Sequence, residues 1–278
     1  MLEGNKMIYL QDGLHFLKSL EKDSVDLILT DPPYQISKET GMQQARDNKE
    51  GLKKFRIQTK FGDWDESFGL NELAPFIKEM YRVLKPSGTL ICFYDLWKLS
   101  YLARLLEDTG FKQLRYIEWL KTNPMPINSK LNYLTNAREV ALTAVKKSKP
   151  LFKSEYDNGI YQFPIYQGAT RHFDDGSKVK ERCHPTQKSI PLFEALINKH
   201  SNRGDLVIDP FLGSGTTYLS ARNTGRKFKG AEVSAEYYGL CLKRIETFYP
   251  QYFEELKRPG FCKPGRTATL GRYIIGST

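Results

Sequence analysis

The chain has 278 residues, 40% of them hydrophobic, and its 42 lysines and arginines exceed its 32 acidic residues, giving a net charge of +10. This length fits one large domain, or one domain with an insertion. The charge favours a polyanionic partner such as nucleic acid, although a solvated basic surface would give the same balance. The four cysteines lack the spacing of metal ligands and are too few for a disulfide scaffold. No 18-residue apolar run or signal-peptide pattern occurs, which argues against a membrane protein and predicts a cytoplasmic location.

A carboxylate follows the first predicted strand. Residues 6–10 are predicted to form a short strand, and leucines at helical spacing up to residue 20 predict a helix after it. Asp12 lies between the two, where its side chain can cap the helix. It can also bind a ligand, because ligands of open α/β sheets lie beyond the carboxyl ends of the strands.

The second predicted strand ends in the tetrapeptide Asp31-Pro32-Pro33-Tyr34. Residues 25–30 are a short apolar run typical of a buried strand, and the two prolines stop it because neither can donate to the sheet. Asp31 and the carbonyls beside the prolines can accept hydrogen bonds from an amino group, and Tyr34 offers a face to a flat ring. The tetrapeptide therefore suits the amino group of an aromatic base, although a plain turn with a surface tyrosine is the alternative.

The middle of the chain alternates helix and strand after a long polar loop. Residues 37–60 carry seven basic residues against three acids, which predicts either a flap that orders against phosphate or a solvated loop. Two of the later strands are expected to form an antiparallel pair at one edge of the sheet. The predicted elements are helices at 70–84 and 96–108 and strands at 89–94, 115–121 and 139–147.

Residues 146–182 lose regular periodicity. Aromatic and basic residues interleave there, which suits a nucleic-acid surface and equally a small subdomain packed on its own tyrosines. His172 and His184 have no companions at ligand spacing, so a structural role is expected for both and no metal is predicted.

A glycine-rich turn follows the strand at 205–209. It opens a helix, and the next strand, at 227–231, ends at Glu232, an arrangement typical of a site for a nucleoside-bearing cofactor. Thr216 after Gly215 replaces the lysine that a P-loop requires, and Tyr218 stands where a dinucleotide fold needs a third glycine. S-adenosylmethionine, which has no pyrophosphate, fits best. Helices are predicted on either side of this unit, at 191–200 and 236–248.

Three motifs in this order resemble the β-class DNA amino-methyltransferases of bacterial restriction–modification systems. They are Asp-Pro-Pro-Tyr at 31–34, His-Pro-Thr-Gln-Lys at 184–188 and Asp-Pro-Phe-Leu-Gly-Ser-Gly-Thr-Thr at 209–217, and the resemblance extends from about residue 7 to residue 248. It implies an α/β, Rossmann-like methyltransferase fold that is circularly permuted. We expect a mostly parallel twisted sheet with an antiparallel edge hairpin and helices on both faces.

The resemblance also implies domains and roles. Residues 1–121 would be the catalytic half, 122–182 the target-recognition region, 183–249 the cofactor-binding half and 250–278 a basic tail without an assigned role. The implied catalytic residues are Asp31, Pro32, Pro33 and Tyr34. The implied cofactor-binding residues are Asp12, Asp31, Thr186, Lys188, Asp209, Pro210, Phe211, Gly213, Ser214, Gly215, Thr216, Thr217 and Glu232, with Asp12 at the adenine, Glu232 at the ribose and 186–188 near the methionine part.

The expected reaction is site-specific N6 methylation of adenine in double-stranded DNA. The base is stacked in the duplex, so it must be extruded, with Tyr34 stacking on it and Asp31 and the Pro32 carbonyl accepting from its amino group. Asp31 rather than serine favours adenine N6, and cytosine N4 methylation is the alternative. No cysteine follows a proline, as the nucleophile of cytosine-C5 enzymes does, so no covalent nucleophile is expected.

Two other functions fit less well. RNA and protein-amide N-methyltransferases usually begin the tetrapeptide with asparagine, and a catalytically dead DNA-binding module would not be expected to keep Asp31 and both glycines. The expected partners are double-stranded DNA, a second copy of the chain in a homodimer and a cognate restriction endonuclease acting on the same site, without a membrane.

Overall fold

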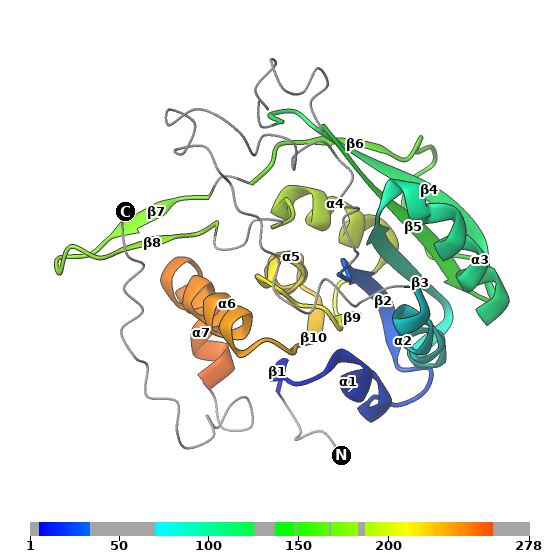
Figure 1. Cartoon of the computed structure of the whole chain (residues 1–278), viewed down its shortest axis with the longest axis horizontal. Helices are drawn as coiled ribbons and strands as arrows, with labels where there is room; N and C mark the ends of the chain where they lie inside the picture. Colours follow the sequence, from blue (N-terminus) through cyan, green and yellow to red (C-terminus); the bar gives the residue numbers. More distant parts are fainter. Residues whose placement is uncertain are drawn as a thin grey trace, which may run out of the picture.

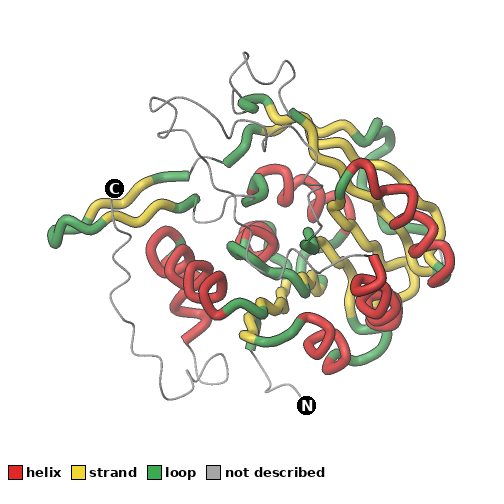
Figure 2. Tube along the Cα trace, in the orientation of Figure 1, coloured by secondary structure: helices red, strands yellow, loops and turns green. Residues whose placement is uncertain are grey.

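The computed structural model describes residues 6–33, 70–124, 137–147, 149–166, 168–182 and 187–257. The predicted loop at 37–60 lies outside them, as do Tyr34 and Thr186. In the described part of the chain, an eight-stranded sheet has the order β1-β10-β9-β2-β3-β5-β4-β6 (Figure 1). The helices in that part lie on either side of the sheet, as Figure 2 shows.

Five neighbouring strands of the sheet are parallel, which confirms the predicted α/β fold. They are β1 (Ile8–Leu10), β10 (Lys227–Glu232), β9 (Leu206–Asp209), β2 (Val25–Thr30) and β3 (Leu84–Tyr94). Among the described strands of this sheet, β1 comes first in the sequence and pairs with β10, which comes last, so two segments far apart in the sequence are neighbours in the sheet. This order agrees with the predicted circular permutation.

The predicted antiparallel pair is present, but it is not the outermost pair. β5 (Arg138–Lys146) runs antiparallel to both β3 and β4 (Phe111–Lys121). A further short strand, β6 (Ile160–Phe163), pairs in parallel with the outer side of β4. The segment 122–182, predicted as a recognition region, thus contributes both β5 and β6 to the central sheet.

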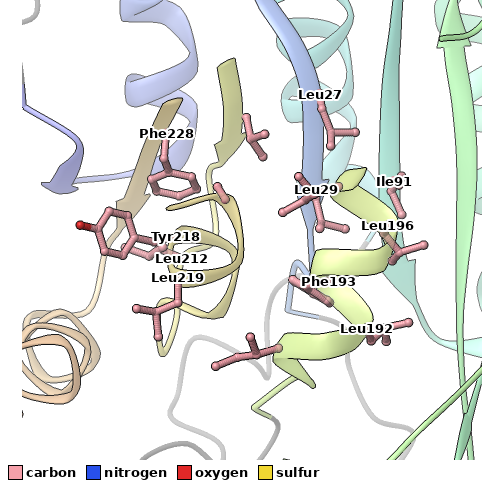
Figure 3. Close-up of a cluster of buried hydrophobic side chains, with 14 of the residues drawn as sticks. Leu27, Leu29, Ile91, Leu192, Phe193, Leu196, Leu212, Tyr218, Leu219 and Phe228 are labelled. Atoms are coloured by element: carbon pink, nitrogen blue, oxygen red, sulfur yellow. The ribbon is translucent and has the colours of Figure 1, made fainter. Parts of the chain in front are cut away.

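The helices cover both faces because alternate residues of the central strands face opposite cores. Leu27 and Leu29 of β2 belong to one buried cluster and Ile28 to the other. Figure 3 shows the first of these clusters, where β2 lies beside α4. The first face carries α4 (Ile190–His200), α5 (Thr216–Asn223), α6 (Ala235–Phe248) and α7 (Pro250–Lys257), and the second carries α1 (Gly13–Ser19), α2 (Leu70–Val83) and α3 (Leu99–Thr109), which follows a short 3-10 helix, η2 (Leu96–Lys98).

Two segments are more regular than the sequence predicts. The irregular region near residue 175 forms an antiparallel ribbon of β7 (Thr170–His172) and β8 (Lys178–Lys180), which extends away from the sheet (Figure 1). The predicted tail begins with helix α7, whose Leu256 is buried, so helical structure packed on the core extends past residue 249. No helix within the described ranges is long and apolar enough to cross a membrane.

Candidate active site

The predicted site residues lie at the ends of adjacent parallel strands. Ile28 of β2 pairs with Ile208 of β9, so Asp31, directly after β2, and Asp209, the last residue of β9, lie at the same edge of the sheet. Glu232 ends β10 and is paired with Leu10 of β1. Because ligands of open α/β sheets bind beyond this edge, the two sequence motifs meet where a ligand site is expected.

The glycine turn is tied to Glu232 by backbone hydrogen bonds. Gly213 N donates to Glu232 Oε2 at 2.8 Å, and Ser234 N donates to Oε1 at 2.9 Å. Burial raises the pKa of Glu232, and these two hydrogen bonds offset part of the rise. Each oxygen keeps a lone pair for a further donor, so Glu232 can hold the turn and still accept hydrogen bonds from hydroxyl groups of a ligand.

The carboxylate of Asp209 connects the end of β2 to the glycine turn by hydrogen bonds. Its Oδ1 accepts from Thr30 Oγ1 at 2.7 Å and from Phe211 N at 3.0 Å, and its Oδ2 accepts from Thr217 Oγ1 at 2.6 Å. Burial raises the pKa of this carboxyl to about 6, partly offset by these hydrogen bonds. Asp209 therefore joins the last residue of β2 to the glycine turn and to the first turn of α5.

Asp12 is the N-cap of α1, as predicted. Its Oδ1 accepts from His15 N at 2.9 Å. The next residue, Gly13, lies against the glycine turn, since a Cβ at that position would be 2.3 Å from the carbonyl oxygen of Pro210. The ring of Phe76 also lies near Gly13, and its centroid is 4.8 Å from that of the Phe211 ring in the turn. Asp12 is thereby placed next to the turn.

Asp31 belongs to a group of four charged side chains. Lys188 Nζ lies 2.6 Å from Asp31 Oδ2 and 2.8 Å from Glu139 Oε2, and Lys121 Nζ lies 2.7 Å from Glu139 Oε1. The other oxygen of Asp31, Oδ1, is buried and accepts no hydrogen bond from a described residue. The sequence motifs indicated Asp31 and Lys188 but not Glu139 or Lys121. The one signal that could have indicated Glu139 is an acidic residue near the start of a mostly apolar strand.

The charges in this group act on one another. Burial raises the pKa of Asp31, and the adjacent Lys188 offsets part of the rise. Burial acts in the same direction on Glu139, but Lys188 and Lys121 outweigh it and lower the pKa of that carboxyl. The two lysines therefore outweigh burial at Glu139, whereas burial outweighs the lysines at Asp31.

One further basic residue, Arg244 of α6, supports the glycine turn. It is buried, and its Nη1 donates to the carbonyl oxygen of Ser214 at 2.9 Å and to Thr216 Oγ1 at 3.3 Å. The sequence offered no signal for this contact, because α6 is separated from the turn by a strand. Arg244 fixes the backbone of the turn from the side facing the core.

Gly215 cannot be replaced without a clash. Its φ is +79°, and a Cβ would lie 2.5 Å from Cys241 Sγ. We expect Gly215→Ala to lower the free energy of unfolding by about 1–3 kcal/mol, the usual cost of overpacking, as measured by urea denaturation. Gly213→Ala is the control, since its φ is +52° and its Cβ would meet nothing within 4 Å. Adding Cys241→Ala should recover part of the loss, and equal losses in the two single variants would contradict this explanation.

Both the sequence and the fold match known proteins. The profile of a DNA methylase family matches residues 25–243. The Type II methyltransferase M2.DpnII of Streptococcus pneumoniae is 33% identical over 256 residues, covering 87% of this chain and 90% of that protein. M2.LlaDCHI of Lactococcus lactis subsp. cremoris is 32% identical over 259 residues, covering 87% and 89%.

Two solved structures share the fold. The M1.HpyAVI–SAM complex has a TM-score of 0.62 at 30% identity and covers 86% of this chain and 98% of that chain. The cytosine-N4-specific PvuII DNA methyltransferase has a TM-score of 0.64 over 92% of both chains. At 18% identity, the second likeness concerns the fold alone.

Proposed function

Because this chain belongs to the DNA methylase family, we propose that it transfers the methyl group of S-adenosylmethionine to N6 of an adenine in double-stranded DNA. The observation that carries the proposal is the buried Oδ1 of Asp31 at the carboxyl end of β2, which accepts no hydrogen bond from a described residue. A buried acceptor of this kind is costly unless a donor reaches it in the functional complex. The exocyclic amino group of a base is such a donor.

The residues at the glycine turn fit S-adenosylmethionine. A Cβ placed on Gly213 would have no atom of a described residue within 4 Å, so a ligand can approach the backbone there. Glu232 is positioned to accept from the two ribose hydroxyls, and Asp12 lies beside the turn. When bound, S-adenosylmethionine supplies an electrophilic methyl group on sulfur. The proposed cofactor contacts of Lys188 are less direct, because its ammonium group is engaged by Asp31 and Glu139.

The chain's own part in the reaction is to position the amino group. A base in a duplex must leave the stack to reach Asp31. Asp31 Oδ1 and the Pro32 carbonyl would each accept one N–H, which turns the nitrogen lone pair out of the ring plane and towards the methyl group. As the N–C bond forms, the nitrogen becomes positive, and the negative charge of Asp31 stabilises it. The bond between the methyl carbon and sulfur would break at the same time, with its electron pair left on sulfur, and the nitrogen would then give one proton through Asp31 Oδ1 to water.

Several finer features belong to the same proposal. The order of the motifs supports assignment to the β class, and the basic, aromatic segment within 122–182 is proposed to recognise the target sequence. The Type II names of the relatives support a cognate restriction endonuclease, with action on DNA in the bacterial cytoplasm. A homodimer remains a prediction from the resemblance.

The identity of the methylated base is the direct test. We expect purified protein incubated with unmethylated DNA and methyl-labelled S-adenosylmethionine to yield labelled N6-methyldeoxyadenosine after digestion to nucleosides and mass spectrometry. Labelled N4-methyldeoxycytidine would assign the cytosine alternative instead. Label in RNA or protein but not in DNA would overturn the proposal. Sequencing a plasmid from expressing cells, with a readout of modified bases, gives the recognition site.

A further inference from the structure

Four charged groups form a continuous chain that ends at Asp31. In order they are Lys121 of β4, Glu139 of β5, Lys188 before α4 and Asp31 after β2, joined by N–O distances of 2.7, 2.8 and 2.6 Å. The Lys188 side chain is only 4% exposed and lies over the face of Phe93, 5.5 Å from the ring centroid. This series of ion pairs thus links β4, β5 and the segment before α4 to one carboxylate.

Stability alone does not account for this arrangement. Removing charges from water costs several kcal/mol per ion, and apolar side chains of similar size often stabilise a protein equally well or better. The effect of these ion pairs is instead to fix the orientation of the Asp31 carboxylate. Lys188 occupies Oδ2 of Asp31 and leaves Oδ1 without a described partner. Glu139 in turn holds Lys188 from the opposite side.

We propose that Glu139 is a positioning residue for methyl transfer, which fixes Lys188 against Oδ2 of Asp31 so that Oδ1 alone is presented to the substrate amino group. This inference rests on the proposed function. A carboxylate with both oxygens free can rotate and accept the amino group in several orientations. One that is held by Lys188 has a single orientation, and the in-line geometry of the transfer depends on it.

The surrounding charges give the proposal a distinct signature. The groups that face Asp31 among the described residues are Lys188, Glu139, Lys121 and Asp209, with the neutral thiol of Cys92 on β3. Lys188 and Lys121 lower the pKa of Asp31, and the Glu139 charge raises it. If Glu139 acted only by charge, its removal would lower the pKa of Asp31. If it holds Lys188 in place, its removal frees Lys188 and the pKa of Asp31 rises.

The experiment compares Glu139→Ala with Glu139→Gln. The negative charge of Asp31 stabilises the nitrogen as it becomes positive, so kcat/KM falls on the acidic side of the Asp31 pKa. We expect Glu139→Ala to reduce kcat by about 100-fold, with unchanged binding of S-adenosylmethionine, and to move the acidic limb of the profile to higher pH. Glutamine keeps an oxygen that can accept from Lys188, so it should restore most of kcat and should not move the limb upward.

Glu118→Gln is the matched control. Glu118 of β4 also makes an ion pair to β5, with Arg138 Nε at 2.9 Å. The side chains of Glu118 and Arg138 lie on the opposite face of the sheet from those of Lys121 and Glu139, because side chains alternate along each strand. Its kcat and pH profile should equal those of the wild type. A similar loss in Glu118→Gln and Glu139→Ala would show a general effect on the β4–β5 pair and overturn the inference.

The remaining outcomes separate this inference from the function on which it rests. The positioning role is overturned if Glu139→Ala has wild-type kcat, or if its acidic limb moves to lower pH. The proposed function is still upheld in that case, provided that the wild-type protein methylates DNA. Wild-type protein without activity on DNA overturns both. If Glu139→Ala does not fold, Glu139→Asp decides instead. It keeps the negative charge but shortens the side chain by one methylene, so it should lose kcat and raise the acidic limb, and wild-type values of both would overturn the positioning role.

Discussion

Replacing Asp31 with alanine is expected to reduce methyl transfer to DNA by about 10²- to 10³-fold, the usual effect of losing one group that stabilises charge in a transition state. The variant loses the buried acceptor Oδ1 and the carboxylate that stabilises the developing charge on nitrogen. It also leaves Lys188 with Glu139 as its remaining acidic partner among the described residues. Binding of S-adenosylmethionine should stay detectable by calorimetry, because Glu232 and the glycine turn are unchanged.

Asp26→Ala is the matched control for this prediction. Asp26 lies on the same strand, β2, and also pairs with a lysine, Lys85, at 2.6 Å. It lies near the amino end of the strand, where its Oδ2 accepts from Leu206 N. The Asp26 variant should lose some stability and keep its methylation rate. Unchanged turnover in Asp31→Ala would remove the basis of the catalytic assignment.

Gly213→Asp is expected to abolish binding of S-adenosylmethionine, with a loss of affinity of at least about 100-fold, and with it methylation. A Cβ at this position meets nothing within 4 Å, and aspartate tolerates positive φ better than most residues, so the fold should survive. The new carboxylate would occupy the space proposed for the cofactor, next to the acidic Glu232. Two neighbouring negative charges and a filled space both oppose binding.

Gly204→Asp provides the comparison. Gly204 also has a positive φ, +85°, and open space at its Cβ position, but it precedes β9 at the opposite edge of the sheet. Calorimetric titration of both variants, with circular dichroism to confirm folding, should show binding in Gly204→Asp alone. Normal cofactor affinity in a folded Gly213→Asp variant would place the cofactor elsewhere.

Much of the fold could be predicted because local signals and tertiary structure agree. The apolar run ending in two prolines gave β2 with its observed bounds, and the Asp12 cap began α1 where expected. Local signals left the structure from Pro250 onward unassigned, because this basic segment is rich in glycine and proline. Proline is also well suited to the first turn of a helix, and α7 begins there.

The site was only partly predictable for a physical reason. Motifs reveal residues whose neighbours in sequence share the same task, as in the glycine turn. Glu139 and Lys121 have no such neighbours, and their relation to Asp31 appears only when β4, β5 and β2 take their places in one sheet. Long-range ion pairs between isolated residues leave no periodic pattern in the sequence.

The pairing of β1 with β10 has a consequence for synthesis of the protein on the ribosome. Ile8 is synthesised long before its strand partner Gly230, because β2, β3, β4, β5, β6 and β9 all lie between them in the sequence. Until then β1 has no partner in the described sheet, and the edge of β9 that β10 covers is open. Because such distant contacts form slowly, the nascent chain must stay unaggregated with an incomplete sheet until β10 has been translated.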